Sequence, residues 1–110
     1  TTIDLATFNL SFTNGGIMTL AGGQVRTVLS QAINYTVLNT DYAIEATANI
    51  TLTLPAAPTV GQSHEVYANN NTVTINANTG QTVIGRASVS IRRYSAIIIH
   101  YTSTNNWLII

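Results

Sequence analysis

Cysteine and lysine are both absent from this sequence of 110 residues, and charged side chains make up only 7% of it, against about 25% in a typical protein. Without cysteine there is no disulfide framework and no thiol chemistry. Four arginines balance four acidic residues, so the formal net charge is zero. A neutral chain has no long-range field to attract nucleic acid or an anionic membrane. Neither is therefore an expected partner.

Long apolar runs are absent as well. Even the longest, such as Ala96–Ile99, are far shorter than the roughly 20 residues of a membrane-spanning helix. Hydrophobic residues nevertheless make up 45% of the chain, whereas disordered chains are polar and charged. The length suits one domain with one hydrophobic core. We therefore expect a folded domain that does not enter a membrane.

Apolar and polar residues alternate over short stretches rich in β-branched side chains. In residues 49–54, Ile50, Leu52 and Leu54 fall on one face and two threonines on the other. Residues 42–46, 72–76 and 88–92 alternate in the same way, and residues 97–101 form a further strand that is apolar on both faces. Gly, Asn and Pro separate these stretches at intervals of about 8–12 residues, and no helical periodicity is sustained. The pattern predicts an all-β fold, a small antiparallel β-sandwich of the jelly-roll or barrel type.

The chain divides into two parts at the level of sequence. Residues 1–33 form a lead segment in which the apolar phase slips by one residue near Ala6-Thr7, as a bulge or a hinge would require. Residues 34–110 are a denser unit of short strands. No fixed-period repeat is present, and the likeness of the strands at Ile50 and Val73 is interpreted as shared composition, not as a solenoid.

Short motifs follow one another in order through residues 34–110. The opening Tyr35-Thr36-Val37 precedes Asp41-Tyr42; residues 50–55 read ITLTLP, residues 58–62 read PTVGQ, and the chain ends on Asn106-Trp107 with an apolar tail. In this order they resemble a module of phage tail-fibre, head-fibre and capsid decoration proteins. The resemblance covers about two thirds of the chain. It implies a trimeric, β-structured virion protein.

Two surfaces of such a trimer can be assigned from the sequence. The strand at 96–101 is apolar on both faces, which places it centrally or at a subunit interface, and the Arg92-Arg93 pair is suited to gripping a carboxylate of a neighbouring subunit. The lead segment is expected to dock onto capsid subunits or to swap between protomers. The expected interface residues are Ile97, Ile99, Tyr101, Trp107, Ile109, Arg92 and Arg93, and the expected docking residues are Leu5, Phe8, Leu10 and Phe12.

Candidate catalytic chemistry is sparse. The carboxylates are Asp4, Asp41, Glu45 and Glu65, and glycoside cleavage needs two of them flanking one bond. Asp41 falls in a turn and Glu45 within a strand, so both are interpreted as surface groups. No G-x-S-x-G elbow and no phosphate-binding loop with its lysine occur. We expect no catalytic site and no cofactor.

Metal binding and sugar binding are the remaining candidates. His64 and Glu65 point to opposite faces of a strand and cannot share an ion, and only three copies of His100 on a three-fold axis offer an alternative to a histidine that simply packs. Tyr67, Tyr94 or Trp107 are able to stack on a pyranose ring, although most aromatic residues of a small domain lie in its core. No metal site is expected, and a host glycan stays a candidate partner.

The sequence thus predicts a homotrimeric capsid decoration (cement) protein or head-fibre protein, located on the virion surface. Its partners would be further copies of itself and the major capsid protein or another virion protein. The alternative is the receptor-binding tip of a phage tail fibre that recognises a host surface glycan. A lectin-like or adhesin domain is a weaker third possibility.

Overall fold

The computed structural model describes residues 15–17 and 19–110, and within them it contains ten β-strands and no helix. The strands are short, because Gly, Asn or Pro interrupts the alternating pattern between most of them; the β8–β9 turn, Arg92-Arg93-Tyr94, is an exception. The strands are β1 (Val28–Gln31), β2 (Tyr35–Thr36), β3 (Ala43–Ala46), β4 (Ile50–Thr53), β5 (Ser63–Ala68), β6 (Val73–Asn76), β7 (Thr82–Val83), β8 (Ser88–Ile91), β9 (Ser95–Tyr101) and β10 (Asn106–Ile109).

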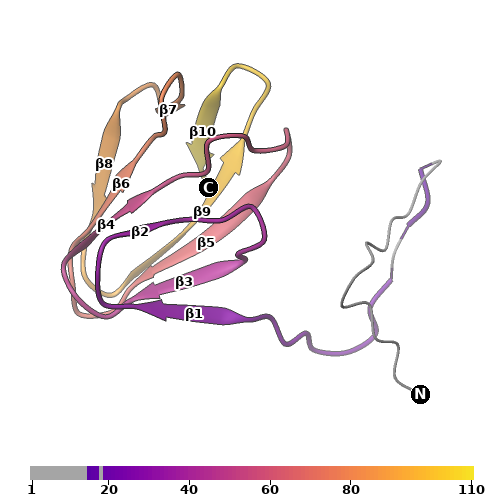
Figure 1. Cartoon of the computed structure of the whole chain (residues 1–110). Coiled ribbons are helices and arrows are strands. Elements are labelled where there is room, and N and C mark those ends of the chain that lie inside the picture. The colour runs from indigo at the N-terminus through magenta and orange to yellow at the C-terminus, as the bar shows by residue number, and fades with distance from the viewer. Residues whose placement is uncertain (1–14, 18) are drawn as a thin grey trace.

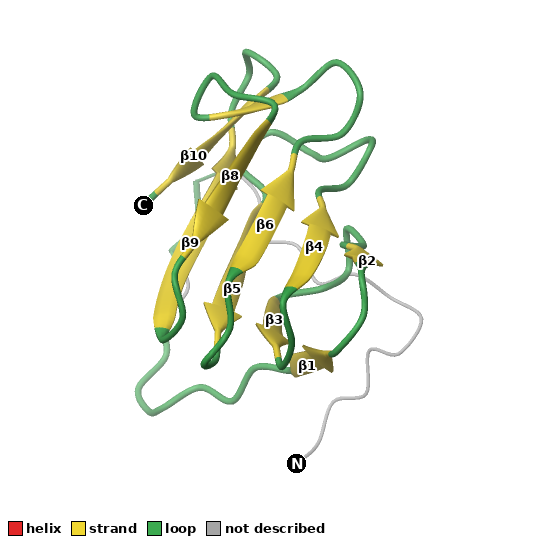
Figure 2. Cartoon of the chain, turned by 90° about the vertical axis from the view of Figure 1, so that its left-hand side faces the viewer, coloured by secondary structure: helices red, strands yellow, loops and turns green. Residues whose placement is uncertain are grey.

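The strands form two sheets that enclose one hydrophobic core, as in a β-sandwich (Figure 1). The six-stranded sheet has the order β1-β3-β5-β9-β10-β7, and the four-stranded sheet has the order β2-β4-β6-β8. The four-stranded sheet lies in front of the larger one in Figure 2. The prediction of an all-β fold is therefore confirmed.

The strand pairing differs from the expected antiparallel pattern, and that part of the prediction is wrong. Five pairs are parallel, namely β1–β3, β3–β5, β2–β4, β4–β6 and β7–β10. Three pairs are antiparallel, namely β5–β9, β9–β10 and β6–β8. The cause lies in the connections. From β1 to β6 the chain crosses to the other sheet after every strand. Every second strand therefore returns to the same sheet in the same direction and lies beside the one before it.

These passes also correct the interpretation of the two similar strands. Ile50 pairs with Val73 and Leu52 with Ile75, in parallel register, so the likeness of β4 and β6 reflects equivalent places in a stacked structure. The register step is 15 residues from Val28 to Ala43 and 22 residues from Ala43 to Glu65. The unequal steps explain why the sequence shows no fixed period.

Asparagine side chains hold the stacked turns together. Asn34 Oδ1 accepts a hydrogen bond from the Thr51 N–H at 2.9 Å, and Asn49 Oδ1 accepts one from the Thr72 N–H at 2.9 Å. Each amide thus satisfies a backbone donor of the following pass, at the point where the chain leaves one sheet for the other. This contact favours a crossing between sheets over a hairpin within one sheet.

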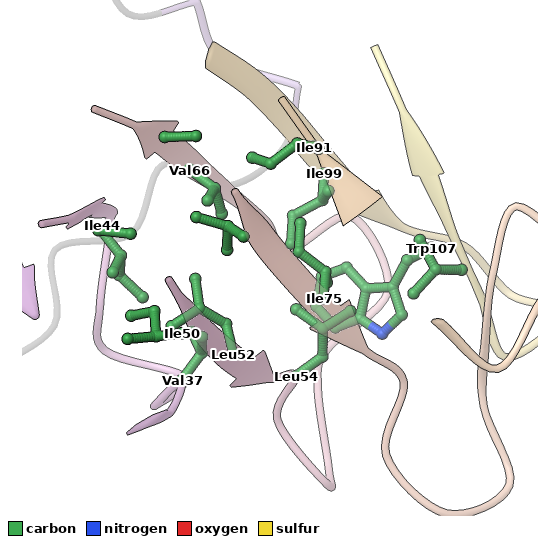
Figure 3. Packing of buried hydrophobic residues seen from close by; sticks show 14 of the residues in the cluster. Val37, Ile44, Ile50, Leu52, Leu54, Val66, Ile75, Ile91, Ile99 and Trp107 are labelled. Atoms are coloured by element: carbon green, nitrogen blue, oxygen red, sulfur yellow. The ribbon is translucent and has the colours of Figure 1, made fainter. Parts of the chain in front are cut away.

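The core lies between the sheets and is built from the inward faces of the alternating strands (Figure 3). Ile50, Leu52 and Leu54 are buried as the alternation predicts. Trp107 is fully buried beside Tyr101, with ring centroids 4.9 Å apart. Its indole N–H donates to Gln81 Oε1 at 2.9 Å, so the large apolar ring is buried without an unsatisfied donor.

The sandwich begins earlier than the predicted boundary between residues 33 and 34. β1 pairs with β3 along its whole length, so Val28–Gln31 belongs to the sheet and not to a separate arm. Residues 19–27 precede it, are exposed, and lead away from the sandwich (Figure 1), with the Arg26 side chain still in contact with Tyr42. The expected docking residues Leu5, Phe8, Leu10 and Phe12 lie outside the described residues.

Candidate functional site

Most of the expected interface residues are directed into the protein's own core. Ile99 and Trp107 are fully buried and Tyr101 is 7% exposed. These three side chains are covered by their own chain, so they are not available to a neighbouring subunit, and we correct their assignment accordingly. Ile97 and Ile109 are partly buried and pack against the same core.

The other face of β9 and β10 carries apolar residues that the sequence reasoning did not select. Ile98 is 39% exposed, Leu108 44% and Ile110 75%. They are close together, because Leu108 pairs with His100 on β9 and the Ile110 N–H donates to the Ile98 carbonyl at 2.8 Å. The alternation identified two faces of this strand, but it gave no sign of which one turns inward. Arg92 and Arg93 are exposed in the turn before β9.

A carboxylate with two tyrosines lies beside this apolar face. Glu65 accepts hydrogen bonds from the Tyr42 hydroxyl at 2.8 Å and from the Tyr67 hydroxyl. The guanidinium of Arg26 lies over the Tyr42 ring, 4.3 Å from its centroid. The hydroxyls of Tyr67 and Tyr42 lower the pKa of Glu65, and the Glu65 carboxylate raises the pKa of both tyrosines. Glu65 is thereby held as an anion that accepts hydrogen bonds.

Two adjoining depressions mark the outer face of the six-stranded sheet. They meet at Tyr67 and Ala96, which line both. The first, of about 260 Å³, is lined by Glu65, Tyr67, Ala96, Ile97, Ile98 and Ile110. The second, of about 350 Å³, is lined by Glu45, Tyr67, Ala68, Asn69, Tyr94, Ser95 and Ala96. A third depression, of about 400 Å³, lies on the four-stranded sheet and is lined by Asn34, Tyr35, Thr36, Thr51, Thr53 and Asn76.

Asp41 has the turn role that the sequence predicts. Its Oδ2 accepts from the Leu38 N–H at 2.8 Å and from the Tyr35 hydroxyl at 2.6 Å. Burial, followed by the hydrogen bond to Asp41, raises the pKa of Tyr35 to about 12. Glu45 lies on β3 and is half-buried, away from this turn, and accepts a hydrogen bond from Ser30 Oγ at 2.9 Å. The two carboxylates belong to separate networks.

His64 and Glu65 face opposite sides of β5, as predicted. His64 is buried, with Nδ1 2.7 Å from the Asp41 carbonyl oxygen and Nε2 2.8 Å from Gln62 Nε2. Both contacts are satisfied by a neutral ring that donates from Nδ1 and accepts at Nε2. Burial lowers the pKa of His64, which favours that neutral form. Within residues 15–17 and 19–110, no three His, Asp or Glu side chains gather as metal ligands would.

No protein-family model matches the chain, and a search of curated proteins finds no similar sequence. Across the part of the chain that the structure describes, no helix has the length and apolar character needed to cross a membrane. The resemblance to phage fibre and decoration modules therefore rests on the sequence motifs alone.

Proposed function

We propose that the protein is a structural component of a phage particle, a homotrimeric capsid decoration or head-fibre protein on the outer surface of the virion. The observation that carries the proposal is an apolar outer face on a chain with almost no charge. Ile98, Leu108 and Ile110 form this face beside β9 and β10. Only 7% of the residues are charged, so few charged groups are available to keep a protein with such an exposed apolar face soluble as a monomer.

Association of copies through this face fits its chemistry. A cyclic oligomer uses complementary patches on every subunit, and burial of apolar surface provides most of the free energy of association. Arg92 and Arg93, which are exposed in the β8–β9 turn, are placed to bind carboxylates at the rim of such an interface. The trimeric state itself is carried over from the resemblance of residues 34–110 to phage virion modules.

Attachment to the particle is assigned to the segment before β1. Ile17 is 91% exposed, Leu20 51% and Val25 102%, so much of this apolar surface is left uncovered by the chain itself. Their burial against a partner would stabilise a complex by about 1.5–3 kcal/mol for each side chain. A trimer would present three such segments at once, and linked contacts raise the overall affinity well above that of one.

The proposal includes no enzymatic activity. A glycosidase needs a carboxylic acid whose pKa is raised so that it can give a proton to the leaving group. The pKa of Glu65 is shifted in the opposite direction by two tyrosine hydroxyls. Asp41 organises a turn, and Glu45 accepts from Ser30. These three carboxylates act as hydrogen-bond acceptors of the fold.

Two experiments test the proposal. Light scattering of the full chain should give three times the 11.8 kDa of one chain, and Ile98→Asp should shift it towards the monomer while the far-ultraviolet circular dichroism is retained. Immunogold labelling should place the protein on the outside of particles released from the source culture. A monomeric wild-type protein would refute the trimer, and its absence from particles would refute the virion role.

A further inference from the structure

Tyr94 adopts a backbone conformation that its side chain disfavours. Its φ is 61°, in the left-handed region, and the residue is 72% exposed in the turn between β8 and β9. The Tyr94 N–H donates to the Ala68 carbonyl, which fixes the turn against the end of β5. A residue with a Cβ is strained in this conformation, and glycine avoids the strain. The turn itself therefore does not call for an aromatic side chain.

The Tyr94 ring borders a depression that already holds polar groups in place. The half-buried Tyr67 lies on the adjacent strand β5, and its hydroxyl is bound to Glu65, which orients the ring. Glu45 accepts from Ser30 Oγ at 2.9 Å and from Asn69 Nδ2 at 3.5 Å. A carboxylate has about four acceptor positions, so Glu45 retains capacity for a ligand. Two aromatic rings thus border a depression of about 350 Å³ that also has an acid and an amide on its wall.

We propose that this depression, bordered by Tyr67, Tyr94, Glu45 and Asn69, binds a saccharide. The apolar face of a pyranose ring packs against tyrosine, and its hydroxyl groups donate to a carboxylate and exchange hydrogen bonds with an amide. Few oriented polar groups on an apolar floor are the usual composition of a small-ligand site. The inference goes beyond the proposed structural role and does not depend on it.

An organic cation is the competing ligand, because tyrosine rings and a carboxylate also attract ammonium groups. The charges of neighbouring side chains disfavour a bound cation. Arg92 and Arg93 immediately precede Tyr94 in the same turn and are exposed, so their positive charges oppose a cation near the ring. A neutral saccharide meets no such opposition, and its hydroxyls use the acceptor capacity of Glu45.

The test is a titration of the uniformly ¹⁵N-labelled full chain, followed by amide chemical shifts. The probes are glucose, galactose, mannose and N-acetylglucosamine at millimolar concentration, together with glucuronate and N-acetylneuraminate. At least one saccharide should shift the amides of residues 67–69 and 94–96. Tyr94→Gly should weaken that binding about tenfold or more, and it should also raise the melting temperature by a few degrees because it relieves the left-handed side chain.

Two variants serve as controls. Tyr94→Phe keeps the ring and should keep the binding within about threefold. Ile84→Asn relieves another left-handed side chain, at φ 43° and outside the depression, and should raise stability without any effect on saccharide binding. The proposal is wrong if no saccharide shifts these amides, if Tyr94→Gly binds as the wild type does, or if tetramethylammonium shifts them where the saccharides do not.

Discussion

Ile98 and Ile99 are neighbours on β9 that face opposite sides of the six-stranded sheet, and they allow a matched test of the packing. Ile99 is fully buried between the sheets, whereas Ile98 is 39% exposed on the outer face. Ile99→Ala removes buried carbon atoms worth about 0.8 kcal/mol each and leaves a cavity. We expect it to lower the free energy of unfolding by about 2–5 kcal/mol. Ile98→Ala should cost about 1 kcal/mol or less.

The single tryptophan provides the assay. Trp107 lies fully buried in the same core as Ile99 (Figure 3), so its fluorescence emission should move to longer wavelength when urea unfolds the chain. The midpoint urea concentration of each variant, at an unchanged slope, gives the loss of stability. For a domain of this size, 1 kcal/mol corresponds to about 4–8 °C in melting temperature, so Ile99→Ala should melt at least about 4 °C below Ile98→Ala.

Protein concentration separates packing from assembly. The Ile99→Ala loss should be the same at every concentration, because the side chain contacts only its own chain. If copies associate through the outer face, the Ile98→Ala loss should change with dilution, since association stabilises the folded form by mass action. Equal losses for the two variants at all concentrations, or a larger loss for Ile98→Ala in a dilute monomer, would show that the inward and outward faces of β9 have been misassigned.

Three further predictions concern other parts of the fold. Burial lowers the pKa of His64 below 6.5, so the unfolded chain takes up the proton at a higher pH than the folded one. In urea titrations from pH 8 to 5, the free energy of unfolding should be constant above about pH 6.5 and fall below it. His64→Gln should lack this part of the decline. Ile84→Asn, at φ 43°, should raise the free energy of unfolding by about 1 kcal/mol, because asparagine tolerates the left-handed region; an unchanged or lower midpoint in urea would contradict that conformation. Asn49→Ala removes the acceptor of the Thr72 N–H and should cost about 1 kcal/mol in thermal unfolding, whereas a neutral effect would mean that water replaces the amide.

Much of the local structure could be predicted from the sequence. The alternation of Ile50, Leu52 and Leu54 with threonines gave a strand with one buried face, because side chains of a strand point alternately to its two sides. Pro55 follows Leu54, after the end of β4, where the strand needs no further backbone N–H for its ladder. The opposite directions of His64 and Glu65 followed from the same alternation.

The candidate site was only partly predictable. Tyr67 and Tyr94 were candidates for sugar stacking from their residue type. Glu45 was interpreted as a solvent-facing strand residue, because nothing local indicates that β3 lies next to β5 and sets Glu45 beside Tyr67. Trp107 was a candidate for both an interface and a sugar, whereas the closure of the two sheets buries it completely.

The sequence alone determined the class of the fold, the short strands and the residues that alternate between core and surface, since these depend on backbone geometry and on the nearest neighbours along the chain. The tertiary structure decided which strands are partners and in which direction they run. A period of two is the same in parallel and antiparallel sheets, so the pattern of β4 and β6 did not specify their parallel pairing. That choice depends on contacts between distant residues, such as the bond from the Thr51 N–H to Asn34. It also depends on burial between two sheets, which decided that Ile99 faces the core and Ile98 the outer surface.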